Sequence, residues 1–241
     1  MAEIIPAILE TSFTEVTRKL AQVKGIVPVV QIDICDGVFT DTPTWPYITP
    51  PREGKPFNYE KSLQFMIAQK EEMPFWNEIE VELDLMISDP IRMLPDLLNA
   101  GPKRVVIHMA SLKDAVSDLH DIARIVPGLV EIGIACLPDA DMEKVSMLVD
   151  ERLVSFVQCM GIAKVGVQGT SGDSAVLEKV CNNLRFLRAR YPTMPLAVDG
   201  GVTREIAKQL TEAGATRLVC GSAVFGGDNP QKRIAELRAV I

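Results

Sequence analysis

Short apolar runs alternate with helical patterns eight times along this chain of 241 residues, without an obvious domain break. The runs are rich in Val, Ile and Leu, as expected of strands that are buried on both faces of a parallel sheet. Eight strand–helix units in strict order are typical of a closed barrel, so we predict one α/β domain over residues 1–241, a (β/α)8 TIM barrel. A doubly wound open sheet is the alternative, but it would not explain why candidate residues follow several different strands.

The element boundaries follow from the apolar runs and from helix caps. We expect strands at 3–9, 29–35, 79–87, 104–109, 129–137, 153–160, 195–199 and 217–225. Helical patterns lie between them at 14–24, 59–71, 90–99, 112–125, 141–149, 174–190, 203–213 and 230–240. Asp89-Pro90 and Asn229-Pro230 are typical helix starts, and Gly101 and Gly214 stand where helices should end.

The composition limits the class of protein and the kinds of partner that we expect. A hydrophobic content of 47% with 24% charged residues is typical of a globular protein. We expect no membrane partner, because no apolar run approaches the ~18 residues that a span requires. The N-terminus lacks a signal-peptide pattern, so we predict a cytoplasmic location. The net charge of −7 argues against a nucleic-acid surface. The five cysteines show no CxxC pairing, and we interpret them as buried thiols.

Two aspartates in similar contexts are the main candidates for chemistry. Asp33 follows the apolar run 29–32, and Asp199 follows Leu-Ala-Val at 196–198. Each therefore lies at the C-terminal end of an expected strand, where the active site of a barrel is built. A buried carboxylate is costly unless it is paired, and two of them facing one cavity suit a two-base proton transfer.

Glycines after the last two strands predict a phosphate site. Gly200 and Gly201 follow one strand, and Gly221 with Ser222 follows the next. Glycine lets backbone N–H groups approach an anion closely, and the loops after strands seven and eight are a frequent phosphate site in barrels. The alternative is that these glycines only make tight turns.

The proline-rich segment 37–58 is unusually long for a connection. Connections of this length are usually functional or mobile. We weigh a lid or a subunit contact equally with a surface loop that has packed aromatic side chains.

Several motifs together resemble the ribulose-phosphate 3-epimerase family over nearly the whole chain. They are Pro-Ala-Ile-Leu (6–9), Asp-Ile-Cys-Asp-Gly-Val-Phe (33–39), Leu-Asp-Leu-Met-Ile (83–87), Val-Val-Ile-His (105–108), Gly-Ile-Ala (133–135), Val-Asp-Gly-Gly-Val (198–202) and Gly-Ser-Ala-Val-Phe (221–225). The stretch at 33–39 is the most specific. The resemblance implies a sugar-phosphate epimerase that inverts a carbon next to a ketone through an enediolate. Asp33 and Asp199 would be its acid/base pair.

The resemblance also implies a divalent metal (Mg, Mn or Zn), no organic cofactor and a phosphorylated sugar substrate, and we expect a homo-oligomer. The family has two metal-binding histidines, but Gln31 and Asp84 stand at their positions. With Asp33 and Asp199 they would give at most an all-oxygen ligand set, which suits Mg²⁺, Mn²⁺ or Ca²⁺ better than zinc. The alternatives are a metal-free site in which one carboxylate stays protonated, or a barrel whose chemistry is lost or changed.

Further substrate contacts follow from the same resemblance. His108 and Met86 would line the cavity, although packing in the barrel interior explains them as well. Gly166 and Gly169 would keep the phosphate-facing role of a mobile loop after the sixth strand. Two other functions stay open: a phosphosugar lyase or decarboxylase of the same barrel group, and a non-catalytic phosphosugar-binding protein. The first is disfavoured because Cys35 stands where those enzymes have a catalytic lysine.

Overall fold

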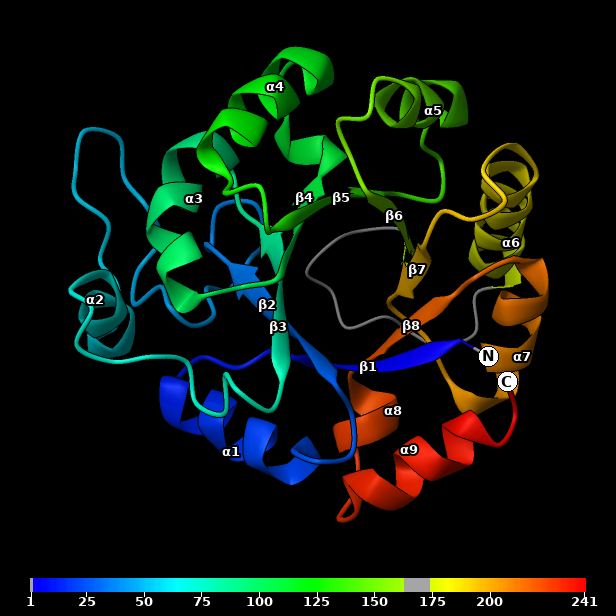
Figure 1. Cartoon of the computed structure of the whole chain (residues 1–241), viewed down its shortest axis with the longest axis horizontal. Helices are drawn as coiled ribbons and strands as arrows, with labels where there is room; N and C mark the ends of the chain where they lie inside the picture. Colours follow the sequence, from blue (N-terminus) through cyan, green and yellow to red (C-terminus); the bar gives the residue numbers. More distant parts are fainter. Residues whose placement is uncertain (1, 163–173) are drawn as a thin grey trace. The chain divides into compact units, whose positions relative to one another are not determined.

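A computed structural model describes residues 2–162 and 174–241. Its eight parallel strands form a closed barrel in sequence order, so the predicted fold class is confirmed (Figure 1). All seven residues of the second strand and all five of the fourth are buried, as in a sheet that is covered on both faces. The strands are β1 (Glu3–Ile8), β2 (Val29–Cys35), β3 (Glu80–Met86), β4 (Arg104–His108), β5 (Glu131–Cys136), β6 (Phe156–Met160), β7 (Leu196–Asp199) and β8 (Arg217–Cys220).

At least one helix follows each strand, as the alternation predicts. They are α1 (Phe13–Val23), α2 (Lys61–Ile67), α3 (Pro90–Leu97), α4 (Ala115–Ile125), α5 (Met142–Asp150), α6 (Ser174–Arg190), α7 (Arg204–Ala213), α8 (Ser222–Phe225) and α9 (Pro230–Arg238), with short 3-10 turns η1 (Leu98–Ala100) and η2 (Met109–Ser111). Two predicted caps are confirmed. The side chain of Asp89 accepts a hydrogen bond from the Arg92 backbone N–H, and that of Asn229 accepts one from Lys232. No helix in the described part of the chain is long and apolar enough to cross a membrane.

The expected strand at 217–225 is wrong in its second half. Strand β8 ends at Cys220, and residues Ser222–Phe225 form helix α8 instead. The backbone turns at Gly221, where φ is −83° and ψ is −87°. A short apolar run does not distinguish a strand from one helical turn, because both bury a continuous row of side chains.

Contacts are denser within two parts of the chain. One part consists of residues 7–132, and the other of residues 2–6 together with 133–162 and 174–241. Strands β2, β3 and β4 belong to the first part, and β6, β7 and β8 to the second. The prediction of one domain over residues 1–241 stays a prediction.

The segment 37–58 is held by buried aromatic side chains. Trp45 is 1% exposed, its indole Nε1–H donates to Ser62 Oγ at 2.8 Å, and its ring stacks on Phe13. Tyr47 is also buried and packs against Tyr59. This packing supports the interpretation as a loop with packed aromatics, while its role as a lid stays a prediction. All five cysteines are free and buried, so the interpretation as buried thiols is confirmed.

Candidate active site

Strands β2 and β3 present one aspartate each at the same level of the sheet. Asp33 and Asp84 are direct partners in the register of the two strands. Gln31 precedes Asp33 by two residues, so the alternation of side chains along a strand places both on one face. All three residues are buried. Within residues 7–132, the fold therefore gathers three of the four residues that were predicted to bind a metal.

The Asp33 carboxylate is oriented by an amide. Gln31 Nε2 donates to Asp33 Oδ1 at 2.7 Å. The strand end is held by Thr44, whose hydroxyl donates to the Asp33 backbone carbonyl at 2.7 Å and accepts from the Cys35 N–H at 2.8 Å. Because a glutamine amide does not take a proton near neutral pH, this contact orients the carboxylate without competing for its proton.

Asp84 is paired with His108 from the neighbouring strand β4. The Nε2 atom of His108 lies 2.9 Å from Asp84 Oδ1, and the side chains are 2% and 0% exposed. A carboxylate removed from water requires such a partner, because desolvation alone would penalise its charge. His108 thus lies beside the position where the family resemblance leads one to expect a metal-binding histidine.

Asp199 ends strand β7 in the second part of the chain. Gln158 Nε2, from the adjacent strand β6, lies 3.3 Å from Asp199 Oδ2 and donates to it. The backbone N–H of Gly161 donates to the Asp199 backbone carbonyl at 2.6 Å. Cys220 is buried nearby on β8. Burial raises the pKa of the Cys220 thiol, and the negative charge of Asp199 adds to this effect.

The glycines after β7 are required by the backbone. Gly200 and Gly201 have φ values of +93° and +67°, in the region that favours glycine. A Cβ atom built on Gly161 would lie 2.0 Å from the carbonyl oxygen of Gly200, so the two backbones approach closely without room for a side chain. Gly221 directly precedes helix α8, which begins at Ser222. These turns account for the glycines whether or not a phosphate binds.

Two sulfur-containing residues lie beside the aspartates of β2 and β3. Cys35 Sγ lies 4.0 Å from Met86 Sδ, and both residues are buried. Burial raises the pKa of Cys35 to about 12; a hydrogen bond with Thr40 opposes this rise, and Asp33 and Asp84 add to it. The thiol therefore stays protonated near neutral pH and is a poor nucleophile. Cys35 and Met86 provide soft, apolar surface there.

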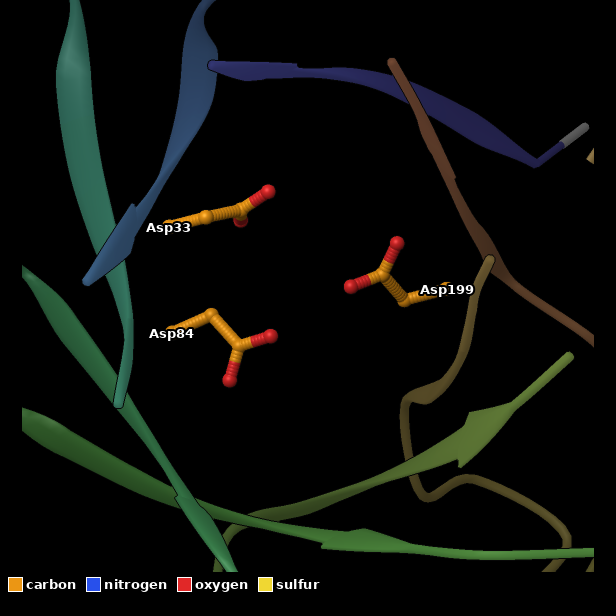
Figure 2. Close-up of side chains that lie close together, drawn as sticks. All are labelled: Asp33, Asp84 and Asp199. Atoms are coloured by element: carbon orange, nitrogen blue, oxygen red, sulfur yellow. The ribbon is translucent and has the colours of Figure 1, made fainter. Parts of the chain in front are cut away.

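The three aspartates form one acidic cluster. An oxygen from each of Asp33, Asp84 and Asp199 lies within 4.8 Å of the other two (Figure 2). Three ionised carboxylates at this spacing repel one another, so the cluster needs a cation or a proton to balance its charge. It can therefore hold a cation through oxygen ligands or exchange protons with a bound molecule.

Two contributors were not identified from the sequence. Gln158 orients Asp199, and the signal for it was a polar residue inside the apolar run 153–160. Asp36 stood in the quoted motif at 33–39 without a role, yet it is fully buried and accepts hydrogen bonds from two segments. The predicted Gly166 and Gly169 lie outside the described residues.

Known proteins that are similar to this chain have the same barrel fold, and they identify the family of the chain. A sequence model of the ribulose-phosphate 3-epimerase family matches residues 58–225. Ribulose-phosphate 3-epimerase of Bacillus subtilis is 27% identical over 241 residues, which covers 99% of both chains. The enzyme of that name from Mycobacterium tuberculosis strain H37Rv is 26% identical and covers 98% of this chain and 91% of its own.

Solved structures share the fold at lower identity. 3-Hexulose-6-phosphate synthase of Salmonella typhimurium superposes with a TM-score of 0.65 at 17% identity, covering 99% of this chain and 97% of its own. Orotidine 5'-monophosphate decarboxylase of Sulfolobus solfataricus gives a TM-score of 0.60 at 9% identity, covering 100% and 98%. At such identities the likeness concerns the fold alone. The family match and the relatives over the full length confirm the resemblance to an isomerase family, and this chain belongs to the ribulose-phosphate 3-epimerase family.

Proposed function

We propose that this protein is a sugar-phosphate epimerase, similar to ribulose-5-phosphate 3-epimerase, which inverts the carbon next to a ketone. The observation that carries the proposal is the cluster of Asp33, Asp84 and Asp199 in a chain of this family. Inversion at such a carbon needs one base on one face of the sugar and one acid on the other, with an enediolate between the two steps. No oxidation or reduction takes place, so the reaction has no need of an organic cofactor.

Asp33 and Asp199 are the proposed acid/base pair. One carboxylate, ionised at the start, removes the proton from the carbon next to the ketone. The other, protonated at the start, donates its proton to the opposite face of the enediolate. The amides of Gln31 and Gln158 support these roles, because each orients one carboxylate. Asp84 and its partner His108 complete the polar surface, and Met86 is a proposed contact with the intermediate.

A divalent cation fits the donor set. Carboxylate oxygens are the ligands that Mg²⁺ and Mn²⁺ prefer, and oxygens of one coordination sphere lie at separations consistent with the observed limit of 4.8 Å. Asp33, Asp84 and Asp199 would hold the cation, with Gln31 beside them. When bound, it would stabilise negative charge on the enediolate oxygens. Zinc fits less well, because the only histidine beside the cluster in the described residues, His108, contacts Asp84.

The phosphate is proposed to bind at the turns after β7 and β8. The positive φ values of Gly200 and Gly201 support this, because such turns direct successive N–H groups toward one side. Gly221 and Ser222 would contribute from the next strand, and Gly166 and Gly169 from outside the described residues. We also propose that the protein is a cytoplasmic homo-oligomer and that it does not bind nucleic acid.

Proton exchange tests the proposal directly. The protein is incubated in D₂O with a panel of ketopentose and ketohexose phosphates, and deuterium at the carbon next to the ketone is followed by NMR. We expect exchange with at least one substrate, and its loss in Asp33→Asn and in Asp199→Asn. Asp121→Asn, on the exposed face of α4, is the matched control. Exchange that survives both active-site changes would refute the pair, and binding without exchange would indicate a phosphosugar-binding protein.

A further inference from the structure

We infer that Asp36 and Phe39 are positioning residues, which hold the His108 imidazole against Asp84. The inference rests on the proposed function only in that the Asp84–His108 pair serves the epimerase site. All four residues belong to the first part of the chain, residues 7–132.

Asp36 joins the chain after β2 to the chain after β3. Its side chain is 0% exposed. Oδ1 accepts from the backbone N–H groups of Val38 and Phe39, each at 2.8 Å. Oδ2 accepts from the backbone N–H and the hydroxyl of Ser88, each at 2.7 Å. Four donors around one buried carboxylate compensate its desolvation and fix the turn that contains Phe39.

The turn leaves little freedom for Phe39. Gly37 has a φ of +75°, and a Cβ atom there would lie 3.0 Å from the side chains of Pro43 and Pro50. The chain therefore makes a tight turn between Asp36 and Phe39. This turn limits the directions in which the Phe39 side chain can point.

The Phe39 ring lies against the His108 imidazole. Their centroids are 5.6 Å apart and the rings are tilted by 57°, a geometry that is favourable for two aromatic rings. The imidazole is thus held at two places: by the Phe39 ring and by Asp84 at Nε2. Without the ring, the imidazole could rotate about its side-chain torsions, and the orientation of the Asp84 carboxylate would change with it.

Histidine side-chain NMR can observe this contact without relying on catalysis. The chain has two histidines, so His120→Gln assigns both imidazole spectra. We expect Phe39→Leu to shift the ring ¹H and ¹⁵N signals of His108, because the ring current is lost and the imidazole reorients. Phe39→Tyr keeps an aromatic ring and should restore them. Val38→Ala is the control from the same turn, since its side chain is 56% exposed.

Kinetics separate positioning from folding. In Phe39→Leu and Asp36→Asn we expect kcat to fall about tenfold with KM within a factor of two, since a small displacement in an active site is costly. Unchanged His108 signals in Phe39→Leu would overturn the inference. This result is decisive even if Asp36→Asn does not fold. Unchanged signals in a folded Asp36→Asn would make Asp36 purely structural. If the wild type shows no proton exchange, the proposed function fails, but the NMR comparison still decides the positioning.

Discussion

His108 Nε2 lies 2.9 Å from Asp84 Oδ1 across the β3–β4 pair, with both side chains almost completely buried. The two residues are 24 positions apart in the sequence and come from neighbouring strands. Their contact gives the acidic cluster a partner that can donate a hydrogen bond and carry positive charge when protonated. Asp84, which stands at the position of an expected metal-binding histidine, therefore has its buried carboxylate paired with a histidine from the neighbouring strand.

Removal of the imidazole should destabilise the fold. His108→Leu leaves the buried Asp84 carboxylate without this partner, so we expect the free energy of unfolding to fall by about 2–3 kcal/mol. His108→Gln retains a donor and should lose less. Urea unfolding followed by circular dichroism measures both, and His120→Leu on the exposed side of α4 is the control. Equal stability of His108→Leu and the wild type would show that the pair contributes nothing.

Breaking the ion pair between Glu82 and Arg104 should cost more stability. Arg104 Nε lies 2.8 Å from Glu82 Oε2, and the side chains of Glu82 and Arg104 are 1% and 9% exposed. Glu82→Gln leaves the buried Arg104 charge uncompensated, which should cost about 3–5 kcal/mol of unfolding free energy. Glu78→Gln is the matched control, because Glu78 pairs with Lys24 at the surface, where about 0–1 kcal/mol is expected. Similar losses in both variants would contradict this prediction.

The raised pKa of Cys35 predicts that the protein loses stability at high pH. Below pH 9 the thiol is protonated in the folded and the unfolded chain. Between the ordinary thiol pKa of 9.0 and the folded pKa of about 12, only the unfolded chain loses the proton, so rising pH favours unfolding. This group should lower the free energy of unfolding by about 1.4 kcal/mol per pH unit within that window.

Urea unfolding of wild type and Cys35→Ala between pH 8 and 10.5 measures the effect. The difference between the two proteins isolates Cys35 from buried tyrosines such as Tyr47, whose pKa is also raised by burial. We expect the slope to be shallower in the variant. Parallel pH profiles would show that the thiol does not titrate differently in the folded state.

Gly161 tests the close approach of the backbones near the proposed phosphate site. In Gly161→Ala the new methyl group meets the Gly200 carbonyl oxygen, which belongs to the backbone and cannot rotate away. We expect a displaced turn, with KM for the sugar phosphate raised at least about tenfold. Gly128→Ala is the control, because nothing lies within 4 Å of its Cβ position. Equal KM values in the two variants would speak against this role of the turn.

Metal dependence can be followed by binding as well as by activity. We expect Mn²⁺ or Mg²⁺ to raise the melting temperature of the wild type, since a ligand that binds only the folded state stabilises it. Asp84→Asn should reduce this increase, whereas Asp121→Asn should not. EDTA should remove proton exchange, and Mn²⁺ should restore it. Stoichiometric zinc by elemental analysis would contradict an all-oxygen site.

Much of the fold was predictable because its signals are local. The apolar runs located seven strands to within three residues at each end and the start of β8, and the glycines after β7 marked turns with positive φ. Helix α8 was missed because Ser222–Phe225 is too short and too apolar to show a helical period. The motif at 33–39 contained Asp36, but its role depends on Ser88, which is 52 residues away.

The order of strands and helices could be read from the amino-acid sequence, as could the positions of Asp33 and Asp199 at the ends of two strands. The pairing of Asp84 with His108, the orientation of one carboxylate each by Gln31 and Gln158, and the anchoring of the Phe39 turn by Asp36 became visible only in the folded chain. The physical reason is that apolar periodicity belongs to one segment at a time. Side-chain pairing depends on the register between strands, which is set by the packing of the folded chain.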